Sequence, residues 1–330
     1  MKALQSKLAL FFILIGTSAW AQTDTSAYNS YKEKIVLYTD IGFSTSPFAI
    51  KTEFSELTKK LQYRNNFKLA FGFGIAYKWF GFRLGISAFN MLPSSKYGKS
   101  QQFNLGVDFT IKKMYFDIDF RNLKGYAVKN AYKWNDSLSS QQPHDTLATI
   151  NTSSFSINSW YFHDKNFKIS TVKGLKGNYK RPVHTWYVKG TLNFFGVTNT
   201  GAPVIPLEIA DSSSTKSFST YYSAFDFGAL PGYAYVNRIK NWQFAAALGF
   251  GAVIQSKFHE INNKNQTFIG LAPRYDIKLY GGYNTEKWFV MLLTDFDNKS
   301  IHYNDVSYSQ FFYTLRLTAG IRFDKKEKKK

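Results

Sequence analysis

Residues 66–90 read NFKLAFGFGIAYKWFGFRLGISAFN, and large apolar side chains recur at every second position. The first series runs from Leu69 to Trp79, and the residues between its members are small or polar. A period of two places the two sets on opposite faces of a β-strand. Gly81 interrupts the series, and a second alternating run follows from Phe82 to Phe89. The stretch therefore predicts a β-hairpin with one bulky apolar face and one face of small and charged residues.

The same alternation recurs along the chain, most clearly in residues 102–121, 184–195, 242–255 and 311–323. In a water-soluble sandwich the apolar face would pack on a second sheet, whereas in a transmembrane barrel it faces lipid and the other face lines the lumen. Aromatic residues make up 18% of the 330 residues, with 32 Phe and 22 Tyr, which is typical of lipid-facing strands with interfacial aromatic belts. We therefore expect an all-β fold, a transmembrane antiparallel up-and-down β-barrel.

Four segments are predicted along the chain. Residues 1–21 are a secretory signal peptide, because Lys2 and Lys7 flank the start of the apolar core LALFFILIG and Ala19-Trp20-Ala21 is a small-x-small cleavage site. The alternative, a membrane anchor, is disfavoured because this core is shorter than the ~18 apolar residues of a spanning helix. We expect a flexible periplasmic lead-in over residues 22–34, an outer-membrane barrel over 35–323 and a basic periplasmic tail over 324–330.

The charge and cysteine content limit the partners. The formal net charge is +20, and the Lys residues are scattered mostly through predicted loops. This distribution favours outer-membrane lipid and lipopolysaccharide, and a small or anionic solute, over nucleic acid as partners. No feature identifies a protein partner. The chain has no cysteine, which excludes disulfides, cysteine-linked haem and thiolate metal sites.

The turns and loops indicate the number of strands. Short turns are predicted near residue 81 and at 112–113, 237–241 and 284–287, and long polar loops at 122–153 and 196–220. Shorter polar loops are predicted at 45–64, 258–266 and 297–304. Barrel strands are usually even in number, with short periplasmic turns and long outer loops. Counts from the two ends of the chain agree only if residues 164–182 add no strand or two, which gives twelve or fourteen strands. We prefer twelve.

Five tryptophans fall at the predicted periplasmic ends of strands. Indole rings favour the membrane interface, because one edge is apolar and the N–H seeks water. The alternative, five packed core residues, gives no reason for a shared end. We predict a periplasmic aromatic girdle of Trp79, Trp160, Trp186, Trp242 and Trp288.

Charged residues on the predicted inner face are the strongest candidates for function. A network in which opposite charges satisfy one another is favoured over a solute path, and both are favoured over catalysis. Asp117 and Asp119 lie on one face of one strand and could in principle bind a cation. The lumen-facing candidates are Arg83, Asp108, Asp117, Asp119, Arg121, Lys189, Arg274, Asp276, Lys278, Arg316 and Arg322.

No sequence motif points to an enzyme. There is no phosphate-binding Walker loop, no His-Glu-x-x-His and no Gly-x-Ser-x-Gly, and the five histidines do not pair at metal-ligand spacing. We therefore expect no catalytic residues, no metal site and no cofactor.

Several short motifs carry a family resemblance. Tyr63-Arg64-Asn65-Asn66, the Gly-rich run Leu69–Tyr77, the segment Tyr161–Phe167 and Pro231-Gly232-Tyr233-Ala234-Tyr235 resemble the family called domain of unknown function 4421. The resemblance covers most of the chain after residue 21 and implies an outer-membrane barrel of the Bacteroidota. It implies no activity and no functional residues.

The sequence is compatible with three functions. The first is a small-solute pore or a ligand-binding and transport barrel. The alternative is a structural or interaction barrel with a plugged lumen, whose outer loops bind a partner or a glycan. An outer-leaflet lipid-modifying enzyme ranks last.

Overall fold

The structure is a computed structural model that describes residues 26–54, 58–66, 68–90, 97–138, 144–261 and 264–324. The predicted signal peptide, residues 22–25 of the lead-in and the basic tail beyond Asp324 lie outside the described residues. None of the helices within these ranges has the length and hydropathy to cross a membrane.

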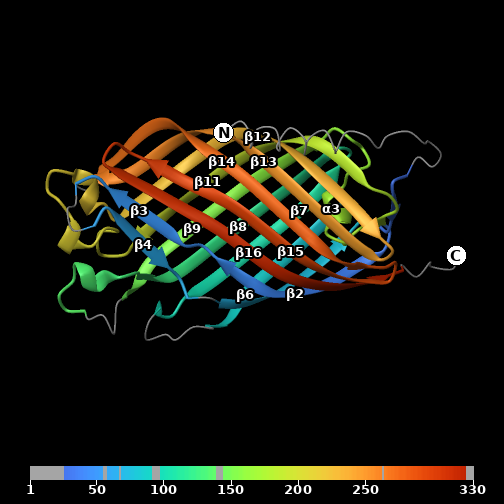
Figure 1. The fold of residues 1–330 in the computed structure, drawn as a ribbon, viewed down its shortest axis with the longest axis horizontal. Coiled ribbons are helices and arrows are strands. Elements are labelled where there is room, and N and C mark those ends of the chain that lie inside the picture. The colour runs from blue at the N-terminus through green and yellow to red at the C-terminus, as the bar shows by residue number, and fades with distance from the viewer. Residues whose placement is uncertain are drawn as a thin grey trace, which may run out of the picture.

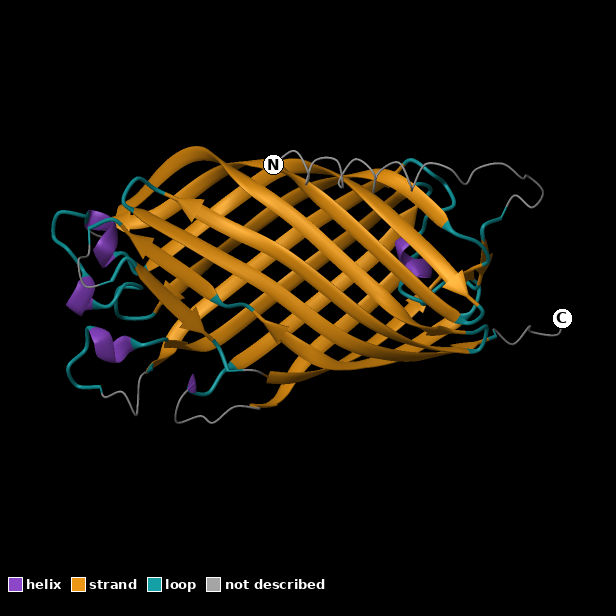
Figure 2. Ribbon diagram, in the orientation of Figure 1, coloured by secondary structure: helices purple, strands orange, loops and turns teal. Residues whose placement is uncertain are grey.

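Twelve antiparallel strands pair into one closed ring. Figures 1 and 2 show the resulting barrel, with its strands inclined to the long axis. Each strand of the ring pairs with its neighbours along the chain, and the last pairs with the first over eleven residues, Tyr313–Phe323 against Ile35–Thr45. This confirms the predicted fold class and the choice of twelve strands. The strands are β2 (Ile35–Thr45), β5 (Lys68–Tyr77), β6 (Phe80–Asn90), β7 (Gln101–Ile111), β8 (Met114–Val128), β9 (Asp145–Phe162), β11 (Val183–Asn199), β12 (Tyr221–Ile239), β13 (Trp242–Ile261), β14 (Lys264–Asn284), β15 (Trp288–His302) and β16 (Val306–Phe323).

The two ends of the barrel differ in their connections. At one end, here called the turn end, two-residue turns begin with Lys78, Lys112 and Lys240, whose positive φ values match the twist of tight hairpins. The described chain starts and finishes at this end, where Lys34 and Asp324 form an ion pair of 3.0 Å. The opposite end, here called the loop end, carries the β8–β9 and β11–β12 connections, with the short helices η1 (Ala131–Lys133), η2 (Leu207–Ile209) and η3 (Thr215–Phe218).

The strands reach further into the loop end than the sequence predicts. The predicted loop at 258–266 is the tip of the long β13–β14 hairpin, and β15 continues to His302 through the predicted loop at 297–304. The predicted loop at 122–153 begins only after Val128 and ends at Asp145. Above the membrane both faces of a strand can carry polar residues, so the alternation that identifies strands disappears.

An extra hairpin completes the wall at the loop end. The predicted loop at 45–64 contains β3 (Phe48–Thr52) and β4 (Lys60–Arg64), which pair with each other. On their outer sides β3 pairs with β16, and β4 pairs with the last residues of β8. β8 can reach β4 because of a bulge at Gly125, where φ is 89°. Beyond the ends of β5, β6 and β7, the hairpin therefore takes their place in the wall.

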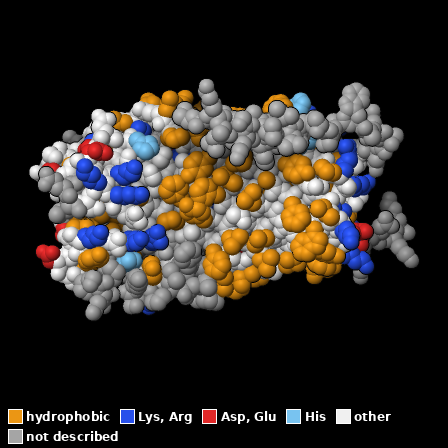
Figure 3. Space-filling model, in the orientation of Figure 1, with side chains coloured by type: hydrophobic (Ala, Val, Ile, Leu, Met, Phe, Trp, Pro, Cys, Tyr) orange, Lys and Arg blue, Asp and Glu red, His pale blue; other side chains and the backbone are white. Residues whose placement is uncertain are grey.

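The outer surface carries a wide apolar band. Figure 3 shows hydrophobic side chains around the middle of the visible face and basic side chains toward both ends. Phe250 is 67% exposed and Leu271 is 70% exposed. A continuous apolar surface of this kind needs an apolar surrounding, which for a closed barrel is lipid. The protein is therefore a transmembrane β-barrel.

The inner surface has three layers, which are clearest along β11. Its inward side chains are apolar at Val183 and Tyr187, polar from Lys189 to Asn193, and apolar again at Phe195 and Val197. A buried apolar cluster fills the lumen at the turn end, and a second one fills it at the loop end. A polar layer lies between the two clusters.

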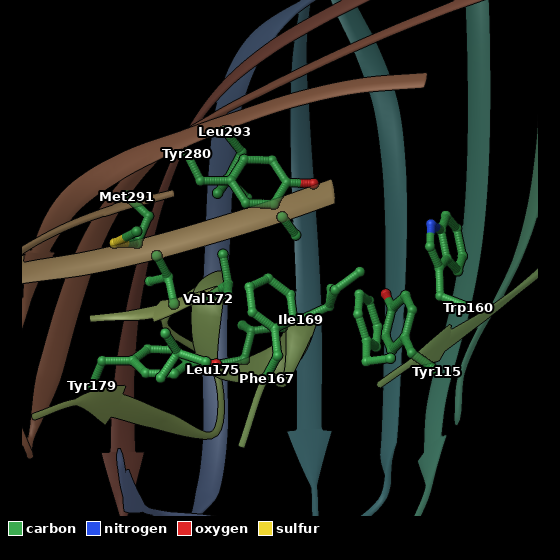
Figure 4. Close-up of a cluster of buried hydrophobic side chains, with 14 of the residues drawn as sticks. Tyr115, Trp160, Phe167, Ile169, Val172, Leu175, Tyr179, Tyr280, Met291 and Leu293 are labelled. Atoms are coloured by element: carbon green, nitrogen blue, oxygen red, sulfur yellow. The ribbon is translucent and has the colours of Figure 1, made fainter. Parts of the chain in front are cut away.

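The turn-end cluster is formed around an inserted segment, residues 163–182, here called the plug. The plug contains α3 (Ile169–Val172) and β10 (Gly177–Tyr179), and Figure 4 shows its apolar side chains facing those of the wall. β10 pairs with β1 (Tyr28–Ser30). Part of the lead-in that we expected to be flexible is therefore a strand, because the plug offers it a free edge inside the barrel.

Candidate functional site

The polar layer surrounds a cavity of about 130 Å³, here called the central chamber. Charges of the two signs are equal in number around it, so the chamber has no net preference for anions or cations. The basic residues are Arg83, Arg121, Lys173, Lys189, Lys278, Lys299 and Arg316, and the acidic residues are Asp40, Asp108, Asp117, Asp119, Asp276, Asp295 and Asp297.

Two ion pairs in the chamber differ in reach, one across a strand and one within a strand. Arg83 on β6 donates from Nε and Nη2 to the two carboxylate oxygens of Asp40 on β2, with both distances 2.7 Å. This bidentate arrangement crosses over β5, where Gly72 leaves the space that a side chain would fill. Arg121 and Asp119 form a second pair at 2.5 Å on β8.

A chain of five alternating charges runs through the chamber from β11 to β16. Lys189 contacts Asp276 at 3.0 Å, and Lys278 lies 3.4 Å from the same carboxylate. Lys278 also contacts Asp295 at 3.1 Å, and Arg316 contacts Asp295 at 3.2 Å. These residues come from β11, β14, β15 and β16. The network holds strands at fixed separation, as expected when opposite charges are buried together.

The structure places all eleven predicted inner charges inside the barrel, and two of them lie outside the central chamber. Arg274, which is 2% exposed, pairs with Asp226 on the loop-end side and donates to the Asn298 carbonyl at 3.0 Å. Arg322 lies at the turn end, where it donates to the carbonyls of Gly174 and Leu175 in the plug.

Not every buried charge finds a partner. Asp108 lies directly opposite Asp117 across β7 and β8, and its Oδ1 atom has no hydrogen-bond partner among the described residues. The Nζ atom of Lys176, which is buried in the plug, likewise has none there. Lys299 donates to the hydroxyls of Ser154 and Ser156 instead of to a carboxylate. The chamber therefore keeps an unused acceptor on Asp108, and the plug keeps an unused donor on Lys176.

Sequence reasoning missed several chamber residues. Asp297 and Lys299 fall in a predicted loop, and Lys173 falls in the segment whose structure the sequence left ambiguous. The strand that carries Asp40 has a mixed pattern, which hid its inward face. Asp295 was detectable in principle, because it has the same parity as Leu293 and Met291 on β15, which also point inward.

Four of the five predicted girdle tryptophans point outward near the turn end, with exposed fractions of 59% for Trp79, 48% for Trp186, 52% for Trp242 and 45% for Trp288. The prediction is wrong for Trp160, which is 2% exposed and lies inside the barrel. Trp160 shares the parity of the inward Asn158, and its ring lies beneath the ammonium groups of Lys189 at 5.0 Å and Lys278 at 5.6 Å. The prediction used only how close each tryptophan lies to a strand end, which does not show whether its indole points outward or inward.

Polar side chains of the wall fasten the plug by its backbone. Gln243, which is fully buried, donates to the carbonyls of Thr171 and Val172 and accepts from the Tyr179 N–H at 3.1 Å. Asn284 donates to the Gly177 carbonyl at 2.9 Å. Side chains of the wall, rather than backbone pairing with wall strands, therefore hold the plug in the lumen.

The loop-end closure, here called the cap, is built differently. Its centre is Tyr63 of β4, which stacks on Phe48 of β3 at 4.3 Å and donates to the Val204 carbonyl at 2.6 Å. Val204 belongs to the β11–β12 loop, which lies over the lumen with Ile205 and Ile209 buried. Lys216 of the same loop pairs with Asp305 at 2.9 Å. The cap thus consists of wall strands and the loop that joins two of them.

No group of three or more His, Asp or Glu side chains among the described residues is placed to hold a metal ion.

Residues 22–323 match the family described as a domain of unknown function, DUF4421. The chain belongs to this family. The match covers the whole predicted barrel and confirms the resemblance drawn from the sequence motifs. No curated protein matches this DUF4421 barrel in sequence.

Solved structures similar to this DUF4421 barrel include three outer-membrane proteins. The outer membrane protease OmpT from Escherichia coli is 9% identical, with 92% of this chain and 100% of that chain covered and a TM-score of 0.42. The translocator domain of the autotransporter NalP from Neisseria meningitidis is 9% identical, with 98% and 96% covered and a TM-score of 0.40. The COG4313 outer membrane channel from Pseudomonas putida F1 is 10% identical, with 92% and 100% covered and a TM-score of 0.36.

Proposed function

We propose that this barrel lies in the outer membrane with its turn end toward the periplasm, exported by the signal peptide at residues 1–21. There it acts as a ligand-binding and transport barrel for a small charged solute, and its lumen is closed at rest. The observation that carries this proposal is the central chamber, an internal cavity lined by seven charges of each sign.

The chemistry of the chamber favours a solute that carries both charges. Buried polar groups in native structures are nearly always hydrogen-bonded, so the free Asp108 Oδ1 atom and the Lys176 ammonium require water or a ligand. A cavity of about 130 Å³ has room for several water molecules or one small solute. Because the lining is balanced, a zwitterion matches it better than a simple anion or cation.

The plug is the proposed gate. It enters and leaves at the turn end, between β9 and β11, so it can move without breaking any pairing between strands of the wall. Lys173 of the plug lines the chamber together with Asp108 and Asp117 of the wall, and Lys176 lies close enough to Asp108 for their charges to interact. A solute with both charges can compete for these groups. No catalytic step is assigned to the chamber, and the protein is proposed not to be an enzyme.

The second candidate is a plugged interaction barrel. The observation in its favour is that buried apolar side chains fill the lumen at both ends. In that case the chamber charges serve stability only, and the β8–β9 and β11–β12 loops at the loop end contact a partner or a surface glycan.

Conductance and solute uptake in liposomes separate the two candidates. We expect the wild-type barrel to conduct little, and a variant in which residues 165–180 and the cap-loop residues 205–217 are each replaced by Asn-Gly to conduct ions and admit small zwitterions. The matched controls replace only one of the two segments and should stay closed, because the apolar cluster at the other end still fills the lumen. If the double-deletion barrel shows heat-modifiable migration, and is therefore folded, but remains silent, the transport proposal is wrong and the interaction barrel is supported.

A further inference from the structure

The outer wall near the turn end contains an apolar groove of about 500 Å³. It crosses β13, β14, β15 and β16, and its lining includes Trp242, Tyr283 and Trp288 toward the turn end and Leu292 and Leu317 further along the wall. The groove opens outward and lies apart from the central chamber, with which it shares no lining residue.

The groove exists because an outward position carries no side chain. Gly281 lies between Phe244 on one neighbouring strand and Leu292 on the other, and both of those side chains point outward. A Cβ atom at residue 281 would lie 3.1 Å from the Phe244 ring. Most other outward positions in this part of the wall carry large apolar groups, and the small Ala319 of β16 lies opposite Val290. Gly281 and Ala319 together therefore leave a local hollow in the lipid-facing surface.

Three aromatic rings line the turn-end side of the groove. Tyr283 stacks on Trp288 with the ring centroids 5.1 Å apart, and Trp242 meets Tyr283 edge-on at 5.6 Å. Such contacts hold the three rings in place, so the hollow has a fixed shape.

Two lysines lie near these aromatic rings in the sequence and at the same end of the barrel. Lys240 lies in the turn that precedes Trp242, and Lys287 directly precedes Trp288. Both side chains are exposed, and neither is paired with a carboxylate in the part of the chain that the structure describes. The nearby Glu286 contacts Lys34 at 2.9 Å, so it does not neutralise them. An apolar hollow with positive charge at its membrane-interface end matches the shape and charge of an anionic lipid.

We propose that this groove binds one anionic phospholipid of the periplasmic leaflet, with an acyl chain along Gly281 and the phosphate beside Lys240 and Lys287. Burial of apolar surface gives no driving force within hydrocarbon, so a lipid is retained only by close packing and by its head group. The groove supplies the packing, and the lysines supply the attraction for phosphate. The choice of leaflet rests on the proposed orientation of the barrel, whereas the preference for a negative head group does not.

Native mass spectrometry of the purified barrel with phosphatidylglycerol or phosphatidylcholine tests the site. We expect one retained phosphatidylglycerol and little retained phosphatidylcholine. The double variant Lys240→Glu/Lys287→Glu should reduce retention by roughly tenfold or more, because it reverses both charges near the phosphate. The matched control is Lys112→Glu, which reverses a charge at another turn of the same end and should leave retention unchanged.

A second measurement follows the acyl chain. In liposomes with brominated phosphatidylglycerol chains, quenching of tryptophan fluorescence should be weaker for Gly281→Leu than for the wild type, because the new side chain fills the groove beside Trp242 and Trp288. Gly281→Ala serves if the leucine variant fails the heat-modifiability test for folding. Equal retention of both lipids by the wild type, or unchanged retention and quenching in all groove variants, would overturn the proposal. Conductance of the barrel that lacks the plug and the cap loop is independent of these results, so the two proposals fail separately.

Discussion

The plug and the cap close the same lumen with apolar side chains, but they are attached in different ways. The plug is one connection folded into the barrel, and polar side chains such as Gln243 and Asn284 hold its backbone. The cap is made of strands whose backbone pairs with the wall, with Tyr63 and Phe48 among its central residues.

This difference in attachment determines which of the two closures can open. Opening the plug requires the loss of side-chain hydrogen bonds and of the three-residue β1–β10 pairing. Opening the cap requires β3 and β4 to leave β16 and β8, which would break the wall itself. Local opening costs less where few backbone pairings are lost. We therefore expect changes in the cap to affect global stability and changes in the plug to affect local opening.

The largest effect is expected at the centre of the cap. Tyr63 is fully buried, so Tyr63→Ala should lower the free energy of unfolding by about 3–5 kcal/mol, as for other large aromatic truncations in a core. Urea unfolding in lipid vesicles measures this. The control, Tyr63→Phe, loses only the hydrogen bond to Val204 and should cost about 1 kcal/mol. An alanine variant as stable as the wild type would contradict the role given to the cap.

A smaller, local effect is expected at the plug. Gln243→Ala leaves two carbonyls and one N–H of the plug without their partner, at a cost of about 1–3 kcal/mol. Hydrogen exchange of residues 169–179 should therefore accelerate, while global unfolding changes little. Gln255→Ala is the matched control, since Gln255 is an equally buried glutamine that contacts Asp226 and Ser300 away from the plug. Equal exchange of the plug in both variants would argue against its separate fastening.

The smallest effect is a pH response of the cap loop. Burial raises the pKa of Asp305, but the hydrogen bonds from Ser214 and Lys216 outweigh this and hold that pKa below its ordinary value. A carboxyl with a depressed pKa stabilises the folded state above the ordinary pKa of about 3.9, and this contribution is lost as the pH falls through the folded value.

Hydrogen exchange of residues 204–219, corrected for the intrinsic rate, should therefore increase on acidification below about pH 4. In Asp305→Asn the exchange should already be raised at neutral pH and should respond less to acid. A wild-type loop that is indifferent to acid would show that this ion pair does not hold the cap.

Much of the wall could be predicted from the sequence, and the reason is the membrane. Lipid favours an apolar outward side chain at every second position, so the alternation predicted β13 from Trp242 onward and β16 up to Phe323. The charges that line the lumen followed from the opposite parity. The alternation is lost where lipid no longer imposes this contrast, so β3, β4 and the loop-end halves of β8 and β15 were not predicted.

Local residues alone were enough to predict the barrel class, a choice between twelve and fourteen strands, the family and eleven of the inward charges, because a period of two is a local pattern. The tertiary structure alone decided that the lumen is closed, that Trp160 points inward and that residues 28–30 pair with the plug. It also decided which charges pair, because Arg83 and Asp40 or Lys189 and Asp276 meet only when distant strands close into a ring. The alternation of side chains predicts which face of a strand a residue occupies. Only the closed ring determines which residues of other strands lie opposite it.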